Sequence, residues 1–342
     1  MTTTPLDRRP AGNAGDPDAP VTTITYDGDE SRPLQDLPKT RLWARLEQIA
    51  LTAFIAVPLL AVAAAGFVLW GNGLSWRDVV ISTVAYAFTG HGITVGFHRY
   101  FTHGSFKAKR PLRIALAVAG SMAIEGPVTR WVADHRRHHA YSDKEGDPHS
   151  PWRYGNDFWS LCKGLWHAHV GWLFDIEQTD QKRFAPDLLA DRDVHLVNRL
   201  FPVWVVISLA LPPLVGGVWA SAVDEGFWYG AVTAFFWASL VRVAVLHHAT
   251  WSINSICHTF GERPFNTRDK SANVWPLAFI AMGESWHNLH HADPTAARHG
   301  VDRWQIDSSA ELIRGFEKLG WATDVRWPKA ERLEAKRIAA TR

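Results

Sequence analysis

Histidine is concentrated in three short clusters of this 342-residue chain, and a fourth element adds one more imidazole. The clusters read His98-Arg-Tyr-Phe-Thr-His103, His135-Arg-Arg-His138-His139 and His287-Asn-Leu-His290-His291, and the looser element reads Asn254-Ser-Ile-Cys-His258. Imidazole binds Zn, Cu, Fe and Ni, so the ligand type does not name the metal. A closed structural zinc site needs only about four ligands. The nine histidines therefore predict a centre with two metal ions.

Helix geometry also favours two ions. At about 100° per residue, positions i and i+3 lie about 60° apart, and positions i and i+4 about 40° apart. His135 and His138 can therefore share an ion, whereas His138 and His139 diverge by about 100°. His98 and His103, at i and i+5, would diverge by about 140° on an α-helix. Two neighbouring ions can collect these ligands more easily than one ion can.

Four long apolar runs predict that the clusters are held by an all-α integral membrane protein. The runs cover 49–70, 79–97, 200–223 and 226–246, and Arg242 interrupts the last. About 20 apolar residues suffice for a helix to cross the ~30 Å hydrocarbon core. The run 114–124 is too short and is predicted to be interfacial or re-entrant. We expect Arg242 to snorkel or to pair with a carboxylate.

The distribution of Lys and Arg predicts the orientation in the membrane. The linkers 71–78 and 224–225 contain one such residue, Arg77, whereas 1–48, 98–199 and 247–342 contain six, fifteen and thirteen. The positive-inside rule then places both termini and all histidine clusters in the cytoplasm. We expect two helical hairpins in the cell (inner or plasma) membrane, with the histidine clusters converging on the cytoplasmic side.

The remaining composition limits the function classes and the domain organisation. The net charge of +2 argues against a nucleic-acid partner. Cys162 and Cys257 are too few for a cysteine-based metal cluster. Residues 1–40 are predicted to form a disordered tail, residues 41–325 the membrane domain, and residues 326–342 a C-terminal tail. Ser308 to Glu311 fits a capping box that opens a helix through about Leu319.

These motifs resemble those of the membrane-bound fatty acyl Δ9 desaturases, the stearoyl-CoA desaturase family, in its bacterial form. The resemblance runs from about residue 75 to 325, and it includes Trp131-Val-Ala-Asp134, Asp147-Pro-His149, His169-Val-Gly-Trp172 and Ala249-Thr-Trp251. It implies four transmembrane helices with a cytosolic cap. It also implies two iron ions that use O₂ and two electrons to place a cis double bond in a saturated acyl chain.

The resemblance also implies roles for single residues. One iron would take His98, His139, His258 and His291, with Asn254 holding a water as a further ligand. The other iron would take His103, His135, His138, His287 and His290. Trp131, Asp134 and Trp251 would contact the substrate. Apart from the resemblance, His149, His167 and His169 are expected to lie beside the metal ligands or to serve as structural groups near the cap.

The sequence departs from the family in ways that bear on the carrier of the acyl chain. Ala133 replaces an Arg of eukaryotic members, and Gly126-Pro127 replaces a polar pair thought to touch the CoA headgroup. The substrate could therefore be an acyl-CoA, an acyl-lipid or an acyl-carrier-protein thioester. No GxGxxG, cysteine set or fused haem motif is present, which implies a separate electron donor, either ferredoxin-like or a flavoprotein reductase.

Three alternatives stay open at this point. The same di-iron architecture also serves lipid hydroxylases. A membrane metal transporter is disfavoured because nearly all predicted ligands lie beyond the spans. His91, His247 and His248 could bind a haem within the membrane, although polar packing between helices explains them more simply.

Overall fold

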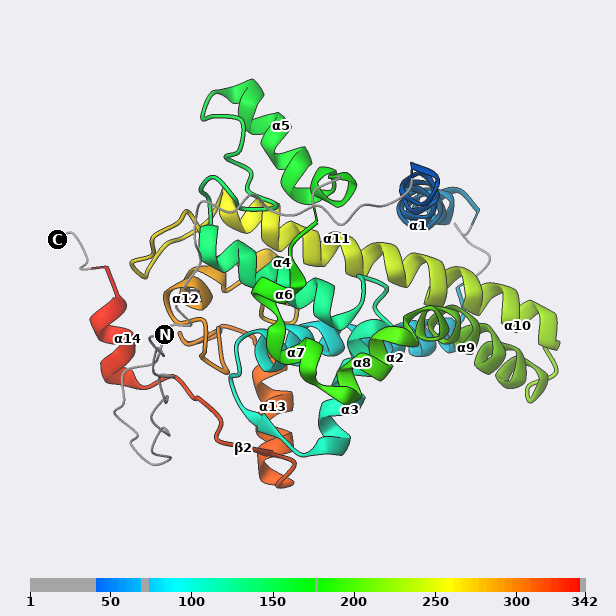
Figure 1. Ribbon diagram of the computed structural model, residues 1–342. Coiled ribbons are helices and arrows are strands. Elements are labelled where there is room, and N and C mark those ends of the chain that lie inside the picture. The colour runs from blue at the N-terminus through cyan, green and yellow to red at the C-terminus, as the bar shows by residue number, and fades with distance from the viewer. Residues whose placement is uncertain (1–40, 69–73, 176–177, 339–342) are drawn as a thin grey trace, which may run out of the picture. The chain divides into compact units, whose positions relative to one another are not determined.

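The computed structural model describes residues 41–68, 74–175 and 178–338, and these are mostly helical (Figure 1). The predicted disordered tail, 1–40, lies outside the described residues. The described part contains a single two-stranded antiparallel sheet, in which β1 (Lys107–Ala108) pairs with β2 (Ala322–Thr323). The predicted all-α class is therefore confirmed.

Four helices of the described chain are long and apolar enough to cross a membrane, as predicted. The candidate spans are Gln48–Ala65, Trp76–Thr102, Phe201–Ser221 and Phe227–His258. They correspond to α1 (Arg41–Val68), α2 (Trp76–His91) with the π-helix η1 (Gly92–Thr102), α9 (Phe201–Ser221), and α10 (Phe227–Ala234) with the π-helix η3 (Phe235–Val241), α11 (Arg242–Ser255) and η4 (Ile256–His258). The second and fourth of these continuous helices, here called the second and fourth rods, extend beyond the predicted spans and carry histidines at their ends.

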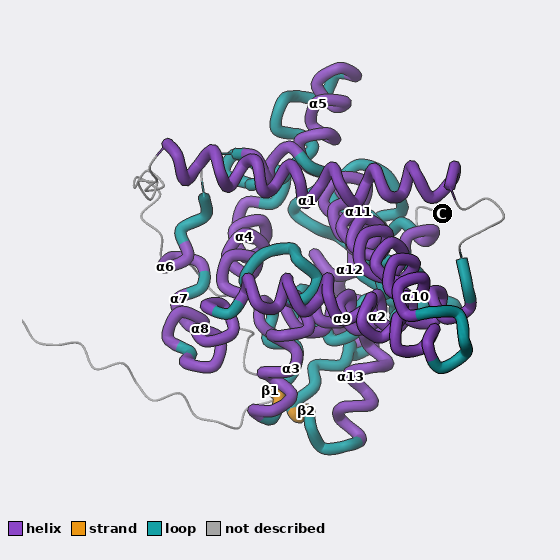
Figure 2. The backbone as a smooth tube through the Cα atoms, turned by 90° about the vertical axis from the view of Figure 1, so that its right-hand side faces the viewer, coloured by secondary structure: helices purple, strands orange, loops and turns teal. Residues whose placement is uncertain are grey.

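The four candidate membrane-spanning helices, here called the stem, have an apolar exterior and small residues where they pack against one another. Leu60, Val84 and Val232 are 67%, 64% and 64% exposed, as expected for side chains that face lipid. Between α9 and α10, a side chain at Gly216 would meet the Gly230 backbone, so the two helices approach closely. In Figures 1 and 2, α1 crosses the α10–α11 rod rather than running along it, and it packs on η3 and α11.

Arg242 lies buried inside the stem, and its hydrogen-bond partners differ from both predictions. Its guanidinium donates to the carbonyl and hydroxyl oxygens of Ser208 and to the carbonyl oxygens of Ala238 and Met122. The expectation of snorkelling or a carboxylate partner was wrong. Backbone carbonyls left over at helix ends and kinks satisfy the cation inside the protein.

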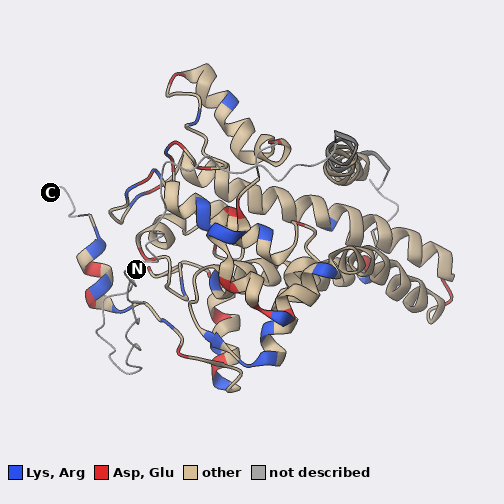
Figure 3. Cartoon of the chain, in the orientation of Figure 1, with Lys and Arg blue, Asp and Glu red and all other residues tan. Residues whose placement is uncertain are grey.

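Short helices and loops form the cap at one end of the long rods (Figure 1). The charged residues gather on this cap, and few lie on α9 to α11 (Figure 3). The cap elements are α3 (Arg110–Ser121), α4 (Val128–Tyr141), α5 (Phe158–His169), η2 (Gly171–Phe174), α6 (Gln181–Phe184), α7 (Pro186–Ala190), α8 (Arg192–Arg199), η5 (Trp275–Leu277), α12 (His287–Ala292), α13 (Ser308–Lys318) and α14 (Ala330–Lys336).

Two details at the C-terminal end differ from expectation. The helix predicted at Ser308 is present as α13, but its N-cap is Asp307, whose side chain accepts from the Ala310 N–H. Ser308 instead bonds to the His91 ring. The segment predicted as a C-terminal tail contains α14, and Arg332 pairs with Asp293 at 2.6 Å.

Candidate metal centre

Four elements bring all nine predicted histidine ligands together at the cap end of the stem. His98 lies in η1 and His103 directly follows it, while α4, η4 and α12 carry the others. The donor nitrogens form two groups, within each of which they lie within 4.8 Å of one another. The first group is His98, His103, His135, His139 and His290, and the second is His138, His258, His287 and His291.

The predicted division of the ligands between two ions was wrong. In each HxxHH box the first and last histidines pair, with Nε2 to Nε2 distances of 3.1 Å for His135 and His139 and 3.0 Å for His287 and His291. The histidine at the fourth position of each box belongs to the opposite group. His138 joins the second group, and His290 joins the first. The reason is angular, because the i+4 offset of about 40° is smaller than the i+3 offset of about 60°.

The π-helix explains why His98 and His103 share a group. Their rings lie 4.9 Å apart between centroids, although an α-helix would turn them about 140° away from each other. The His103 N–H donates to the His98 carbonyl at 3.2 Å, an i to i+5 bond. This wider turn carries residues five apart to one face of the helix. The sequence alone gives no indication of the π-helix.

The nitrogen spacing fits one ion in each group. Neighbouring Nε2 atoms lie 3.1 Å apart for His98 and His290, and 3.0 Å apart for His258 and His287. Two imidazoles at right angles on one ion, with bonds of about 2.1 Å, would be about 3.0 Å apart. In addition, His103 Nε2 and His138 Nε2 are buried without a hydrogen-bond partner. A metal ion in each group would account for the close spacing of the nitrogens and would give the two unpartnered nitrogens a partner.

Carboxylates fix the orientation of four of these rings from behind. Asp147, Asp143 and Asp269 lie 3.0, 2.9 and 2.7 Å from the Nδ1 atoms of their partner histidines, and Glu284 contacts the Nδ1 atom of the fourth histidine. The partners are His138, His258, His291 and His98, respectively. A ring that donates Nδ1–H to a carboxylate presents the Nε2 lone pair to a metal. Except for Asp147, which belonged to a quoted motif, sequence reasoning missed these carboxylates, because nothing in their spacing points to the boxes.

Electrostatics keeps most of the cluster in the form that binds metals. Burial holds the pKa of several imidazoles well below the usual 6.5, and neighbouring imidazoles lower it further. These are His103, His135, His139, His287 and His290. Burial acts on His138 in the same direction, but Asp147 outweighs it and raises the pKa of His138. Neutral imidazole is the ligand form, so the cluster is prepared to bind cations at neutral pH.

Several of the other histidines have partners within the protein. The His149 ring packs against the His138 ring, tilted by 32° with centroids 4.3 Å apart, so it lies beside the second group. His91 bonds to the Ala87 carbonyl and His247 to the Ala123 carbonyl. His248 bonds to His169 at 2.9 Å. These contacts are the polar packing that was preferred over a haem site.

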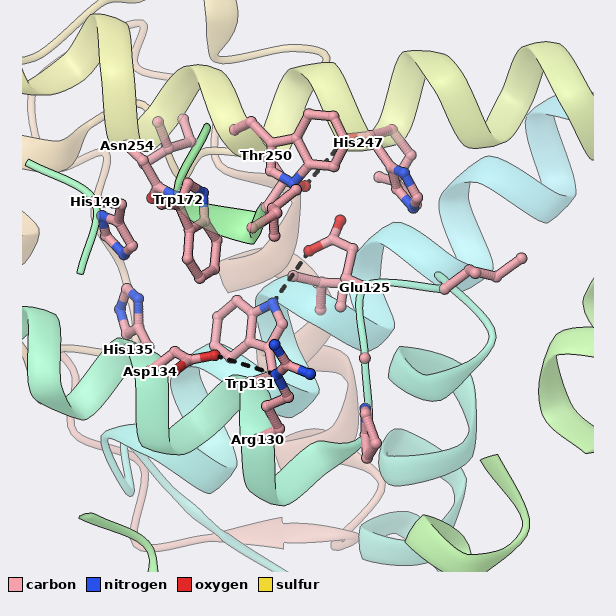
Figure 4. Close-up of a pocket in the computed structure, with 18 of the residues that line it drawn as sticks. Glu125, Arg130, Trp131, Asp134, His135, His149, Trp172, His247, Thr250 and Asn254 are labelled. Carbon is pink, nitrogen blue, oxygen red and sulfur yellow. Dashed lines mark hydrogen bonds and ion pairs between the residues drawn. The ribbon is translucent and has the colours of Figure 1, made fainter. Parts of the chain in front are cut away.

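A cavity of about 870 Å³ reaches both histidine groups. Figure 4 shows part of its wall, including His135 of the first group. Its wall includes His98 and His135 of the first group and His287 of the second. The three predicted substrate-contacting residues, Trp131, Asp134 and Trp251, also line it, and so does Asn254. Much of the remaining wall is apolar, contributed by residues such as Leu51, Phe54, Ile93, Leu246 and Ile253. This lining suits an apolar chain that passes both histidine groups.

One acid on the cavity wall was missed from the sequence. Glu125 accepts a hydrogen bond from the Trp131 indole N–H at 3.1 Å (Figure 4). Burial raises its pKa from 4.5 to about 7, although hydrogen bonds with Thr250 and Trp131 oppose the rise. A single acid between two apolar stretches carries no sequence signal of this kind.

Sequence comparisons with known proteins identify a family and several related enzymes. A family model described as "Fatty acid desaturase" matches residues 74–322. The chain is 41% identical to a hex-5-enoyl-[acyl-carrier protein] acetylenase of Moorena producens, with 83% of this chain and 87% of that protein covered. It is 37% identical to an acyl-CoA C20 Delta5-desaturase of Anemone leveillei, with 74% and 75% covered. It is 33% identical to Delta-9 acyl-lipid desaturase 1 of Arabidopsis thaliana, with 88% and 90% covered.

Proposed function

This chain belongs to the fatty acid desaturase family, and from that premise we propose that it is an O₂-dependent desaturase that places a cis double bond at Δ9 of a saturated acyl chain. Its membrane helices and its histidine groups fit that family. The observation that carries the proposal is the cavity that reaches both histidine groups. An acyl chain in this cavity would pass beside both metal positions.

We propose that the nine histidines hold two iron ions, in the groups of five and four described above. When bound, the irons would supply the activation of O₂ that is needed to remove two hydrogens from an unactivated chain. The protein orients the imidazoles through Asp143, Asp147, Asp269 and Glu284. The apolar cavity wall excludes water and fixes which carbons lie beside the centre.

We propose that Asn254 holds a water as a further ligand of the second group. Asn254 precedes His258 by one helical turn and lines the cavity. Water is a weaker ligand than imidazole, so a water held by the amide could leave and open a position for O₂. Asn254→Ala should keep most of its iron but desaturate poorly, whereas His258→Ala should lose metal as well. Normal turnover of Asn254→Ala with both irons bound would contradict this role.

The carrier of the acyl chain is proposed to be CoA or a glycerolipid. The relatives named above include an acyl-CoA enzyme, an acyl-lipid enzyme and an enzyme named for an acyl-carrier-protein substrate. Electrons would come from a separate ferredoxin-like or flavoprotein donor. We place the enzyme in the cell membrane with its centre on the cytoplasmic side.

One second candidate is favoured by a specific observation. The acetylenase relative is 41% identical over 286 residues, so a reaction on an already unsaturated chain is an alternative. Fatty-acid analysis of cells that express the chain, with the position of each new double or triple bond determined by mass spectrometry, separates the two. We expect new cis-Δ9 monoenes, and none from His287→Ala. A new triple bond would favour the alternative, and a hydroxylated product would indicate the hydroxylase.

A further inference from the structure

An apolar loop between η4 and α12 has a position that its sequence does not reveal. Residues 271–283 carry no charged side chain, but 13 residues are too few to cross a bilayer. The structure folds Trp275–Leu277 as a 3₁₀ turn, and the chain continues in turns to Gly283. Its backbone bonds are mostly internal, for example from the Ala281 N–H to the Leu277 carbonyl at 2.8 Å.

Two contacts tie this loop to the side of α2. The Tyr86 hydroxyl donates to the Ile280 carbonyl at 2.7 Å. One turn further along α2, Gly90 packs so closely on the Met282 side chain that any Cβ at this position would collide with it. Leu246 of α11 also lies against Gly90. The loop therefore lies beside both long membrane rods.

These contacts fix the depth of the loop. Twenty residues, the length needed to cross ~30 Å of hydrocarbon, counted from Phe227 at the start of α10, end at Leu246. Leu246 is level with Gly90 because the two residues touch. Tyr86 lies four residues before Gly90, which is about 6 Å deeper along the helix. The Ile280 carbonyl is therefore below the edge of the hydrocarbon.

The two sides of the loop face different surroundings. Trp275 and Phe279 are 75% and 79% exposed on the protein surface. Ala281 packs with Ile253 and Cys257 of the fourth rod, and Ile280, Ala281 and Met282 line the cavity. Exposed aromatic side chains at this depth meet lipid rather than water. The Tyr86 hydroxyl satisfies a carbonyl that would otherwise lack a partner in lipid.

We propose that the segment Trp275–Met282 is embedded in the leaflet on the side of the histidine centre. Trp275 and Phe279 contact lipid chains there, while the inner side of the same segment forms part of the wall of the cavity. A short stretch of backbone thus separates the bilayer from the cavity. This inference goes beyond the proposed function, because it holds for any reaction at the centre.

The test places an environment-sensitive probe on the loop in the complete protein. Phe279→Cys in a Cys162→Ser background is labelled with a nitrobenzoxadiazole maleimide, since Cys257 is fully buried and does not compete. The labelled protein is placed in phosphatidylcholine vesicles that contain lipid with a doxyl quencher near the headgroup end of the chain. Leu319→Cys at the far end of α13, 62% exposed, is the matched control.

We expect the doxyl lipid to quench the Phe279 probe at least threefold more than the Leu319 probe, and aqueous iodide to quench it less. Trp275→Cys provides a second position on the same surface and should behave like Phe279→Cys. Quenching by doxyl lipid no stronger at positions 275 and 279 than at 319 would overturn the proposal. The readout does not involve turnover, so its failure would leave the proposed function unaffected.

Discussion

Glu125→Gln should remove one component of the pH dependence of stability. Glu125 lines the cavity and has a pKa raised to about 7, chiefly because burial disfavours its charged form. Glutamine keeps a carbonyl oxygen that can accept from the Trp131 indole but cannot ionise. The substitution therefore removes the titration while it retains the hydrogen bond at 3.1 Å.

The sign and size of the effect follow from linkage. The unfolded chain loses the Glu125 proton near its ordinary value of 4.5, whereas the folded chain keeps it up to about 7. Between these values the folded state binds more protons, so its free energy of unfolding falls as the pH rises. One pKa unit corresponds to about 1.4 kcal/mol. From pH 6 to pH 8, one pH unit on either side of the folded pKa, the loss is about 1.3 kcal/mol.

The assay compares thermal unfolding of the purified proteins in the same detergent at pH 6 and pH 8. The histidine clusters also titrate, but they are common to both proteins and cancel in the difference. The stability of Glu125→Gln should fall by about 1.3 kcal/mol less over this range than that of the parent protein. Glu317→Gln is the control, because Glu317 accepts from the Trp327 indole at 3.0 Å on α13, away from the cavity. Equal pH dependence in Glu125→Gln and the parent would refute the reasoning.

Three further predictions concern the centre and the topology. His287→Ala removes one of four ligands and should lower the iron content towards one per chain, whereas His290→Ala removes one of five and should retain more; equal losses by elemental analysis would contradict the grouping. Asp269→Asn should weaken metal binding by roughly 10- to 100-fold in competition with a chelator, because it accepts from His291 Nδ1 at 2.7 Å, and unchanged affinity would argue against an orienting role. Reporter fusions should give a cytoplasmic signal after Lys144 and an external signal after Asp224, and an external signal at Lys144 would exclude a shared site.

Much of the stem was predictable because membrane helices have a strong local signal. Length and the absence of charge identified all four candidate spans. Residue type and spacing alone identified the nine ligand histidines, from His98 in the first cluster to His291 in the last. The second and fourth rods extend past the hydrocarbon and carry their histidines there. No hydropathy signal marks the end of a helix in that region. Thus the span predicted to end at residue 246 continues in the structure to His258.

The parts that could not be predicted depend on backbone detail or on distant partners. The π-helix at Gly92–Thr102 changes which residues share a face, and no periodicity in its sequence indicates it. Asp143 and Asp269 reach His258 and His291 only because three separate segments meet. The embedded loop lies in a run of 13 uncharged residues. A run of this length is too short to cross the membrane, so length alone favours a place in the cap.

The exchange of histidines between the two HxxHH boxes explains why each box needs three of them. The i and i+4 pair of α4 serves the first group, and its remaining histidine, His138, serves the second. In α12 the pair serves the second group, and His290 serves the first. Each helix is therefore tied to both metal positions. A slip of one residue would rotate a helix by about 100° and misdirect all three of its ligands. Two bound ions would thus fix the rotation of α4 against α12, and with it the cavity wall that α4 provides through Trp131 and Asp134.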